Sequence, residues 1–169
     1  MTNEIKIYTD GSSLGNPGPG GWGVVVISSK QKVESSREVK EEIIKELGGF
    51  EKNTTNNRME LQAVIETLKY IQNSWNDFQN IANDFTIFSD SNYVLSGITS
   101  WIYNWEKNGW RTANKKEVLN QDLWKELIAL IRNADAKIKW EKVKGHSGHV
   151  YNDRADEIAT NCASRQKRE

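Results

Sequence analysis

The sequence predicts an α/β fold, a five-stranded mixed sheet flanked by helices, and three observations lead to it. Strand-like segments open the chain in close succession, which is typical of antiparallel hairpins. Two further strand-like segments come later, and each follows a helix-like segment. A strand reached through a helical crossover usually lies parallel to its neighbour. We therefore expect three antiparallel N-terminal strands and two further parallel strands.

The three hairpin-forming strands are expected between Ile5 and Phe50. Ile5 and Ile7 alternate with polar neighbours and lead to Asp10, and a glycine-rich turn separates this strand from the apolar run Val24–Ile27. The third strand is predicted over Ile43–Phe50. Residues 30–42 form an insertion before it, and the many charges of this stretch leave its structure undecided.

A helix and a fourth strand follow. The helix is expected after Thr54–Glu60, because apolar side chains then recur at helical spacing, at Leu61, Val64, Ile65, Leu68 and Ile71. Asn57 and Glu60 suggest a variant capping box at its start. Ser74–Asn83 is interpreted as a polar connection. Asp84–Asp90 is predicted to be a buried strand, and Asp90 also fits as the N-cap of a following helix.

The last part of the chain alternates aromatic, helical and strand-like segments. An aromatic and basic segment spans 101–111, and a helix is expected over 120–133 with Leu123, Trp124, Leu127 and Ile131 facing inward. A final strand is predicted over 136–143, followed by a loop over 145–149. A closing helix over 152–164 carries a stripe of apolar and small residues, Ala155, Ile158, Ala159 and Cys162.

Length and composition point to one domain over residues 1–169, because the 169 residues show no repeat and no linker. No apolar run is long enough to cross a membrane, and Met1 leads almost directly into a strand, which leaves no room for a signal peptide. The single cysteine, Cys162, excludes an internal disulfide and indicates a reducing compartment. We expect a cytoplasmic protein.

The charge is balanced overall and uneven locally. The chain has 23 basic and 23 acidic residues, and this total argues mildly against nucleic-acid binding. However, residues 33–51 are mainly acidic, whereas residues 101–116 carry Lys107, Arg111, Lys115 and Lys116 against one acid. A local site for a polyanion therefore stays open.

Four acidic residues are candidates for a metal site. Asp10 and Asp90 end predicted strands, Glu60 lies in the first turn of a helix, and Asp156 lies on the last helix. Each alone has an ordinary interpretation as a turn signal, a cap or a solvated acid. Gathered together they would repel one another unless cations were present, and an all-oxygen site favours Mg²⁺ or Mn²⁺. Two such ions about 3.5–4 Å apart form a phosphodiester-cleaving arrangement.

Four long motifs carry a resemblance to a known family. They are TDGSSLGNPGPGGWG, TTNNRMEL, SDSNYVLSGITSWIYNWEKNGW and VKGHSGHVYNDRADEIA, in this order. From about Ile5 to Ala163 the chain resembles type I ribonuclease H of the bacterial kind. The resemblance implies a ribonuclease H-like fold and an endonuclease that hydrolyses the RNA strand of RNA–DNA hybrids by a two-metal-ion mechanism, which leaves 5′-phosphate and 3′-hydroxyl ends.

The resemblance also implies the catalytic residues. Asp10, Glu60, Asp90 and Asp156 would bind two Mg²⁺ ions, for which Mn²⁺ is a possible substitute, and Asp10 would bridge them. The family places its last acid ten residues after the loop histidine His146, which selects Asp156 rather than Asp153. His146 would assist proton transfer or product release. His149 is expected to be structural.

Residues that contact the substrate are implied in the same way. Asn16, Asn56 and Asn57 would sense RNA 2′-hydroxyl groups, which separate RNA from DNA. Thr55 and Asn120 would bind a DNA phosphate, and Asn53 stands where some relatives have a basic residue. Trp101 and Trp105, with Tyr93 nearby, would pack against DNA sugars. Burial in the core is an equally ordinary role for these aromatic side chains.

The expected partner is an RNA–DNA hybrid duplex, bound by a monomer without a separate hybrid-binding domain. The basic segment carries Glu106, Glu117 and Asp122, so we expect weaker hybrid affinity than in the most basic relatives and a shallower salt dependence. Two alternatives stay open. A non-catalytic hybrid-binding module would not need all four acids, and a DNA-directed resolvase or strand transferase would not need Asn16, Asn56 and Asn57.

Overall fold

The computed structural model describes residues 3–31, 39–82, 84–143 and 149–165, and these form a five-stranded mixed sheet in the order β3-β2-β1-β4-β5. β1 and β2, and likewise β2 and β3, pair antiparallel, whereas β4 lies parallel to β1 and β5 parallel to β4. The predicted fold class is confirmed. The strands are β1 (Asn3–Ser13), β2 (Gly18–Gln31), β3 (Val39–Thr54), β4 (Asp84–Ser89) and β5 (Lys137–Lys142).

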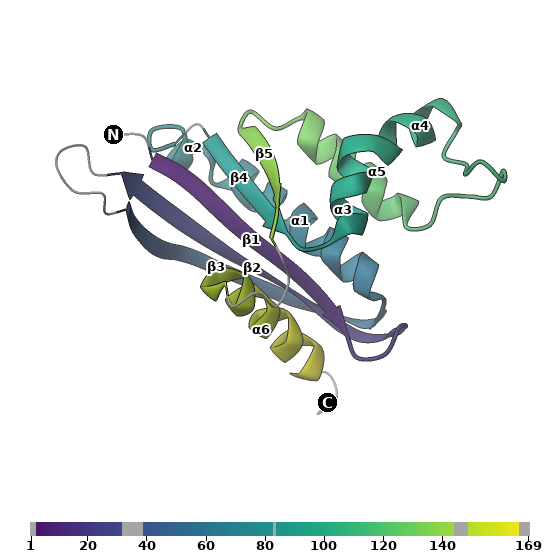
Figure 1. Cartoon of the computed structure of the whole chain (residues 1–169), viewed down its shortest axis with the longest axis horizontal. Helices are drawn as coiled ribbons and strands as arrows, with labels where there is room; N and C mark the ends of the chain where they lie inside the picture. The colour runs from purple at the N-terminus through teal and green to yellow at the C-terminus, as the bar shows by residue number, and fades with distance from the viewer. Residues whose placement is uncertain (1–2, 32–38, 83, 144–148, 166–169) are drawn as a thin grey trace.

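Helices cover both faces of this sheet, and Figure 1 shows α6 by itself on one face and the other long helices on the opposite face. No described helix combines the length and the apolar character needed to cross a membrane. The helical elements are α1 (Asn56–Asn73), α2 (Trp75–Phe78), α3 (Asn92–Ser96), the π-helical turn Gly97–Trp101, α4 (Ile102–Lys107), α5 (Gln121–Arg132) and α6 (Val150–Arg165).

Alternation along β1 divides the core in two, because successive side chains of a strand point to opposite faces. Ile5 and Ile7 are buried in the larger cluster, together with the apolar stripes of α1 and α5. Tyr8 belongs to a smaller cluster with Val25 and with Ala155 of α6. The α1 stripe predicted from the sequence is fully buried, with exposed fractions between 0% and 3%. The sheet is thus held rigidly from both sides.

The charged insertion lengthens a hairpin. Strand β3 starts at Val39, earlier than the predicted Ile43, and Lys30 and Gln31 of β2 pair with Lys40 and Val39. Between the Val26–Lys45 and Ile27–Ile43 pairs, β3 has one extra residue, a β-bulge that bends this edge strand. Residues 32–38 of the insertion lie outside the described residues.

Three expectations about local structure were wrong. The connection Ser74–Asn83 is not simply polar, because it contains α2, whose Phe78 is buried edge-on against Phe85 at 5.3 Å between ring centroids. Asn57 does not cap α1. The cap is Thr55, whose hydroxyl accepts the Arg58 N–H, since Asn57 already lies inside the helix. Likewise the N-cap of α3 is Ser91 and not Asp90.

Candidate active site

Three carboxylates from three different elements meet at one edge of the sheet. Asp10 lies on β1, Asp90 directly follows β4, and Glu60 lies in the second turn of α1. Tyr8 pairs with Phe88 in the parallel β1–β4 ladder, so the two aspartates, each two residues further on, emerge side by side. Ligand oxygens of the three acids all lie within 4.8 Å of one another.

Glycine at position 11 lets the helix approach the strand this closely. A Cβ atom on Gly11 would lie 2.3 Å from the Glu60 backbone nitrogen and 2.3 Å from the Met59 carbonyl carbon. Contacts that short to backbone atoms cannot be relieved by a side-chain rotation. The Gly11 backbone also hydrogen-bonds the Glu60 carboxylate. The absence of a side chain at position 11 therefore places Glu60 beside Asp10.

Burial and mutual repulsion disfavour the charged forms of these acids. Asp10 is 5% exposed and Glu60 is 9% exposed. Loss of solvation, with the nearby Asp90 and Asp156 charges, raises the pKa of Asp10 to about 7, although a hydrogen bond with Glu60 opposes this shift. Burial, followed by the Asp10 charge, raises the pKa of Glu60 well above its ordinary value. Such shifts are typical of a site that needs a cation to hold its charge.

Asp156 of α6 joins the three acids from the other side of the sheet. Its carboxyl group lies close to that of Asp10 and contributes to the raised pKa of Asp10. Asp156 is half-buried, whereas Asp153, one turn earlier on α6, is exposed. We refer to Asp10, Glu60, Asp90 and Asp156 as the carboxylate cluster. The four acids selected from the sequence are thus close together in space.

The carboxylate cluster fits divalent cations. Its donors are all carboxylate oxygens, the donor type that Mg²⁺ and Mn²⁺ prefer. In addition, Oε2 of Glu60 is buried and has no hydrogen-bond partner among the described residues. A buried carboxylate oxygen without a partner is costly, and a bound cation removes this cost together with the repulsion.

The residues implied in 2′-hydroxyl sensing lie at the start of α1 and in the turn that follows β1. Asn16 accepts the backbone N–H of Asn56 through Oδ1 at 3.2 Å, and Asn56 Oδ1 in turn accepts the backbone N–H of Ser13 at 2.8 Å. Asn57 is exposed beside Asn56. The structure therefore brings Asn16 and Asn56 together, although 40 residues separate them.

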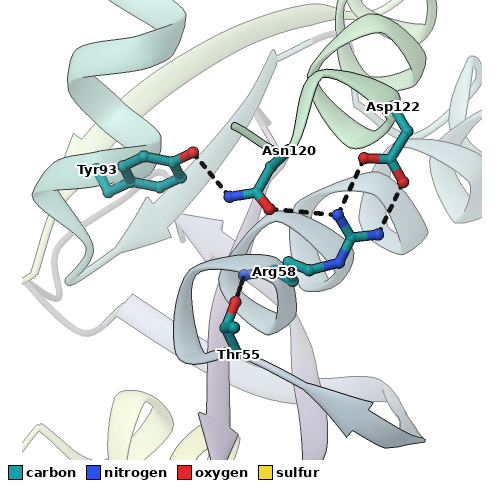
Figure 2. A network of polar contacts seen from close by, with 5 residues as sticks. All are labelled: Thr55, Arg58, Tyr93, Asn120 and Asp122. Carbon is teal, nitrogen blue, oxygen red and sulfur yellow. Dashed lines mark hydrogen bonds and ion pairs between the residues drawn. The ribbon is translucent and has the colours of Figure 1, made fainter. Parts of the chain in front are cut away.

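Thr55 and Asn120 are linked through Arg58, which no sequence pattern had marked as a candidate. The backbone N–H of Arg58 donates to the Thr55 hydroxyl. The Arg58 guanidinium donates to Asn120 Oδ1 at 3.2 Å and to both Asp122 oxygens at 3.0 and 2.7 Å (Figure 2). Asn120 Nδ2 donates to the Tyr93 hydroxyl at 3.0 Å. We call Thr55, Arg58, Tyr93, Asn120 and Asp122 the Arg58 network.

The tryptophans divide between surface and core. Trp101 is 37% exposed, and Trp105 is half-buried 5.8 Å from it between ring centroids. Trp124 is fully buried and contacts Trp105 at 5.4 Å. Tyr93 lies edge-on to Trp101 at 5.7 Å. Trp101 and Trp105 therefore form a partly exposed aromatic surface that rests on a buried ring.

His146 lies outside the described residues. His149 is described, and its ring stacks on Tyr8, which in turn stacks on Phe88 at 4.6 Å. Burial raises the pKa of the Tyr8 hydroxyl to about 12, so that this group stays neutral. His149 has aromatic contacts on the α6 face of the sheet, consistent with the structural role expected for it.

The topology and the carboxylate cluster together define a ribonuclease H-like α/β fold with an acidic site. In structure the chain is similar to LC9-RNase H1, "a type 1 RNase H with the type 2 active-site motif", with a TM-score of 0.74 and 29% identity over 98% of this chain and 74% of that one. It is also 49% identical to the Ribonuclease H of Thermosynechococcus vestitus, over 94% of this chain and 88% of the relative.

A second relative extends the match to nearly full length. The Ribonuclease H of Treponema denticola is 46% identical over 96% of this chain and 98% of the relative. The sequence profile described as RNase H matches residues 2–164. The chain belongs to the RNase H family and is therefore an enzyme of that family.

Proposed function

We propose that the protein is an endoribonuclease that hydrolyses the RNA strand of RNA–DNA hybrids and leaves 5′-phosphate and 3′-hydroxyl ends. The observation that carries this proposal is the set of three buried or half-buried carboxylates with ligand oxygens within 4.8 Å of one another. Membership of the RNase H family supports RNA in a hybrid as the substrate class.

Asp10, Glu60, Asp90 and Asp156 would hold two divalent ions, Mg²⁺ or in its place Mn²⁺, which when bound activate the attacking water and neutralise the leaving oxygen. Asp10 lies centrally, because it contacts both Glu60 and Asp156. Rigid β1 and β4 fix the aspartates, and the Gly11 N–H orients Glu60. The chain therefore supplies preorganised ligands that need little rearrangement.

The other residues would bind the duplex. Asn16, Asn56 and Asn57 would read 2′-hydroxyls on the RNA strand. Thr55 and Asn120 would hold a phosphate of the DNA strand, and Trp101 and Trp105 would pack against its sugars. His146 would take part in proton transfer or product release. We further propose a monomeric, single-domain, cytoplasmic protein, in keeping with its one cysteine.

The test uses four labelled duplexes of one sequence: RNA–DNA, RNA–RNA, DNA–DNA, and DNA with one ribonucleotide. Each is incubated with the protein and Mg²⁺, with and without EDTA, and the products are resolved by length and end group. We expect internal cuts in the RNA of the hybrid, with 5′-phosphate ends, and none in EDTA. Hybrid binding without cuts under Mg²⁺ or Mn²⁺ would indicate a non-catalytic module, and cuts in DNA a resolvase-like enzyme.

A further inference from the structure

The side chain of Asn120 does not do what a residue at its position normally does. Asn120 directly precedes α5, and an asparagine there usually turns its carboxamide back to cap the helix. Here its backbone lies in the left-handed region, at φ 60°, and the side chain makes no capping hydrogen bond. The carboxamide is instead directed toward α1 and α3 (Figure 2).

Two partners hold the carboxamide in one orientation. Arg58 Nη1 donates to its Oδ1 at 3.2 Å, and its Nδ2 donates to the Tyr93 hydroxyl at 3.0 Å. A flipped amide would set its NH₂ group against the guanidinium N–H, donor against donor. Because an arginine has donors only, this flip is excluded, and the two contacts together fix the amide.

The Tyr93 hydroxyl is itself held in place. It accepts a second hydrogen bond from the indole Nε1 of the buried Trp124, at 3.0 Å. The Tyr93 ring lies between Trp124, at 5.4 Å, and Trp101, at 5.7 Å between centroids. The oxygen that receives Asn120 therefore belongs to the rigid aromatic cluster and not to a mobile surface group.

This arrangement leaves one donor of Asn120 for a ligand. A carboxamide nitrogen carries two N–H groups, and Tyr93 takes one of them. The hydroxyl of Thr55, whose backbone precedes Arg58 by one turn, is the second polar group of the proposed phosphate site. An N–H group fixed in advance binds a phosphate oxygen without losing rotational freedom on binding.

We propose that Tyr93 is a positioning residue, whose hydroxyl orients the Asn120 carboxamide so that its second N–H donates to a phosphate of the DNA strand. The proposal rests on the proposed function, because it concerns the phosphate site of the same hybrid. Tyr93 acts through Asn120 and has no part in the chemical step. Its loss should thus raise KM and leave kcat unchanged.

The experiment pairs protein variants with single-phosphate changes in the ligand. A series of hybrids carries one neutral methylphosphonate at successive positions of the DNA strand, and their dissociation constants are measured in EDTA by fluorescence anisotropy. The penalty at each position is the ratio of dissociation constants for the modified and the native hybrid. Both dissociation constants are measured on the same protein, so a smaller fraction of folded protein does not change their ratio.

The phosphate site is found first with Asn120→Ala. At the position where wild type shows a penalty of about tenfold or more, typical of a charge-assisted hydrogen bond, this variant should show almost none. Tyr93→Phe keeps the ring contacts and removes only the hydroxyl. We expect its penalty at that position to fall to about threefold, with KM raised severalfold and kcat unchanged.

Tyr103→Phe is the matched control, because Tyr103 is 59% exposed and lies on the neighbouring helix α4. It should keep the full wild-type penalty. A full penalty in Tyr93→Phe, or a fall in kcat with unchanged KM, would overturn the proposal. If wild type cuts no hybrid, the proposed function fails instead, and the two failures are thereby told apart.

Discussion

The carboxylate cluster and the Arg58 network lie at opposite electrostatic extremes, although both gather polar groups around the start of α1. In the carboxylate cluster like charges meet in a buried place, and Glu60 Oε2 lacks a partner among the described residues. In the Arg58 network a cation meets an anion, and both guanidinium nitrogens that face Asp122 are paired. The first region needs a cation to offset its negative charge, whereas in the second the charges of Arg58 and Asp122 offset each other.

The difference shows how each region relates to its ligand. An acidic cluster whose pKa values are raised by burial stores unfavourable energy that binding of a cation releases. A network whose opposite charges are paired carries no such unfavourable energy. It offers a ligand a hydrogen-bond donor, the second N–H of Asn120, in a fixed orientation. Mutations in the first region should therefore cost activity and not stability, and those in the second should cost some of both.

The largest expected effect is that of Asp10→Asn. It removes the central ligand, and a catalytic metal contributes several kcal/mol, so cleavage of the hybrid should fall about 10³-fold or more. Hybrid binding should persist, and the melting temperature in EDTA should rise because repulsion is relieved. Asp153→Asn, on the exposed side of α6, is the control and should cut normally. A near-normal rate in Asp10→Asn would refute the assignment.

The dependence of stability on pH should differ between the two regions. The pKa of Asp10 is about 7 in the folded protein and 3.8 ordinarily, so the folded state binds the extra proton between these values. Stability in EDTA should therefore fall as pH rises from about 4 to 7, by up to about 4 kcal/mol relative to Asp10→Asn. The free energy of unfolding of both proteins is measured with urea at pH 5 and 8, an interval over which about 3 kcal/mol of this fall is expected. Mg²⁺ should reduce the difference in stability between the two proteins at pH 8.

The Arg58 network supplies the internal control for that series. Its guanidinium holds the pKa of Asp122 below the ordinary value, so the stabilisation is present above about pH 4 and is lost only below it. The stability difference between wild type and Arg58→Ala should thus be equal at pH 5 and 8. If the stability difference between wild type and Arg58→Ala changed between pH 5 and 8, the expected difference in pH dependence between the two regions would be wrong.

A smaller effect is expected when Arg58 is compared with Arg132, another arginine that forms a bidentate ion pair with a carboxylate. Arg58→Ala should cost roughly 1 kcal/mol of stability, since the pair is partly exposed, and should raise KM about fivefold through Asn120. Arg132 forms a bidentate ion pair with Glu106, at 2.9 and 2.5 Å, and this pair is separate from the Arg58 network. Arg132→Ala should leave KM unchanged in steady-state assays. Equal KM values for both variants would show that Arg58 has no part in substrate binding.

The smallest effect concerns Asn53, which is exposed at the end of β3, two residues before Thr55. Asn53→Arg would add one cation near the proposed phosphate site. Hybrid affinity should rise a few-fold, and the slope of log affinity against log salt should steepen by about 0.9. Asn133→Arg, at the far end of α5, adds the same charge elsewhere and should leave the slope unchanged. Equal slopes for both would place the phosphate site away from Asn53.

Much of the carboxylate cluster could be predicted, since its geometry follows from local rules. Asp10 was expected to end its strand, whereas β1 continues to Ser13. Asp10 and Asp90 still lie side by side, because each comes two residues after the Tyr8–Phe88 pair of strands that the crossover rule makes parallel. The Arg58 network could not be predicted in this way. Arg58 and Asp122 are 64 residues apart in a chain with 23 basic and 23 acidic residues, and no spacing indicates which of them pair.

The sequence by itself determined the strands, the long helices and the four candidate acids, because periodicity, strand ends and motif spacing are local properties. Only the tertiary structure decided that α1 touches β1 at Gly11, that Arg58 pairs with Asp122, and that Asn120 turns away from its own helix. Each depends on which surfaces pack together. Packing also decides burial, and burial sets the pKa values and orients the polar groups on which the site depends.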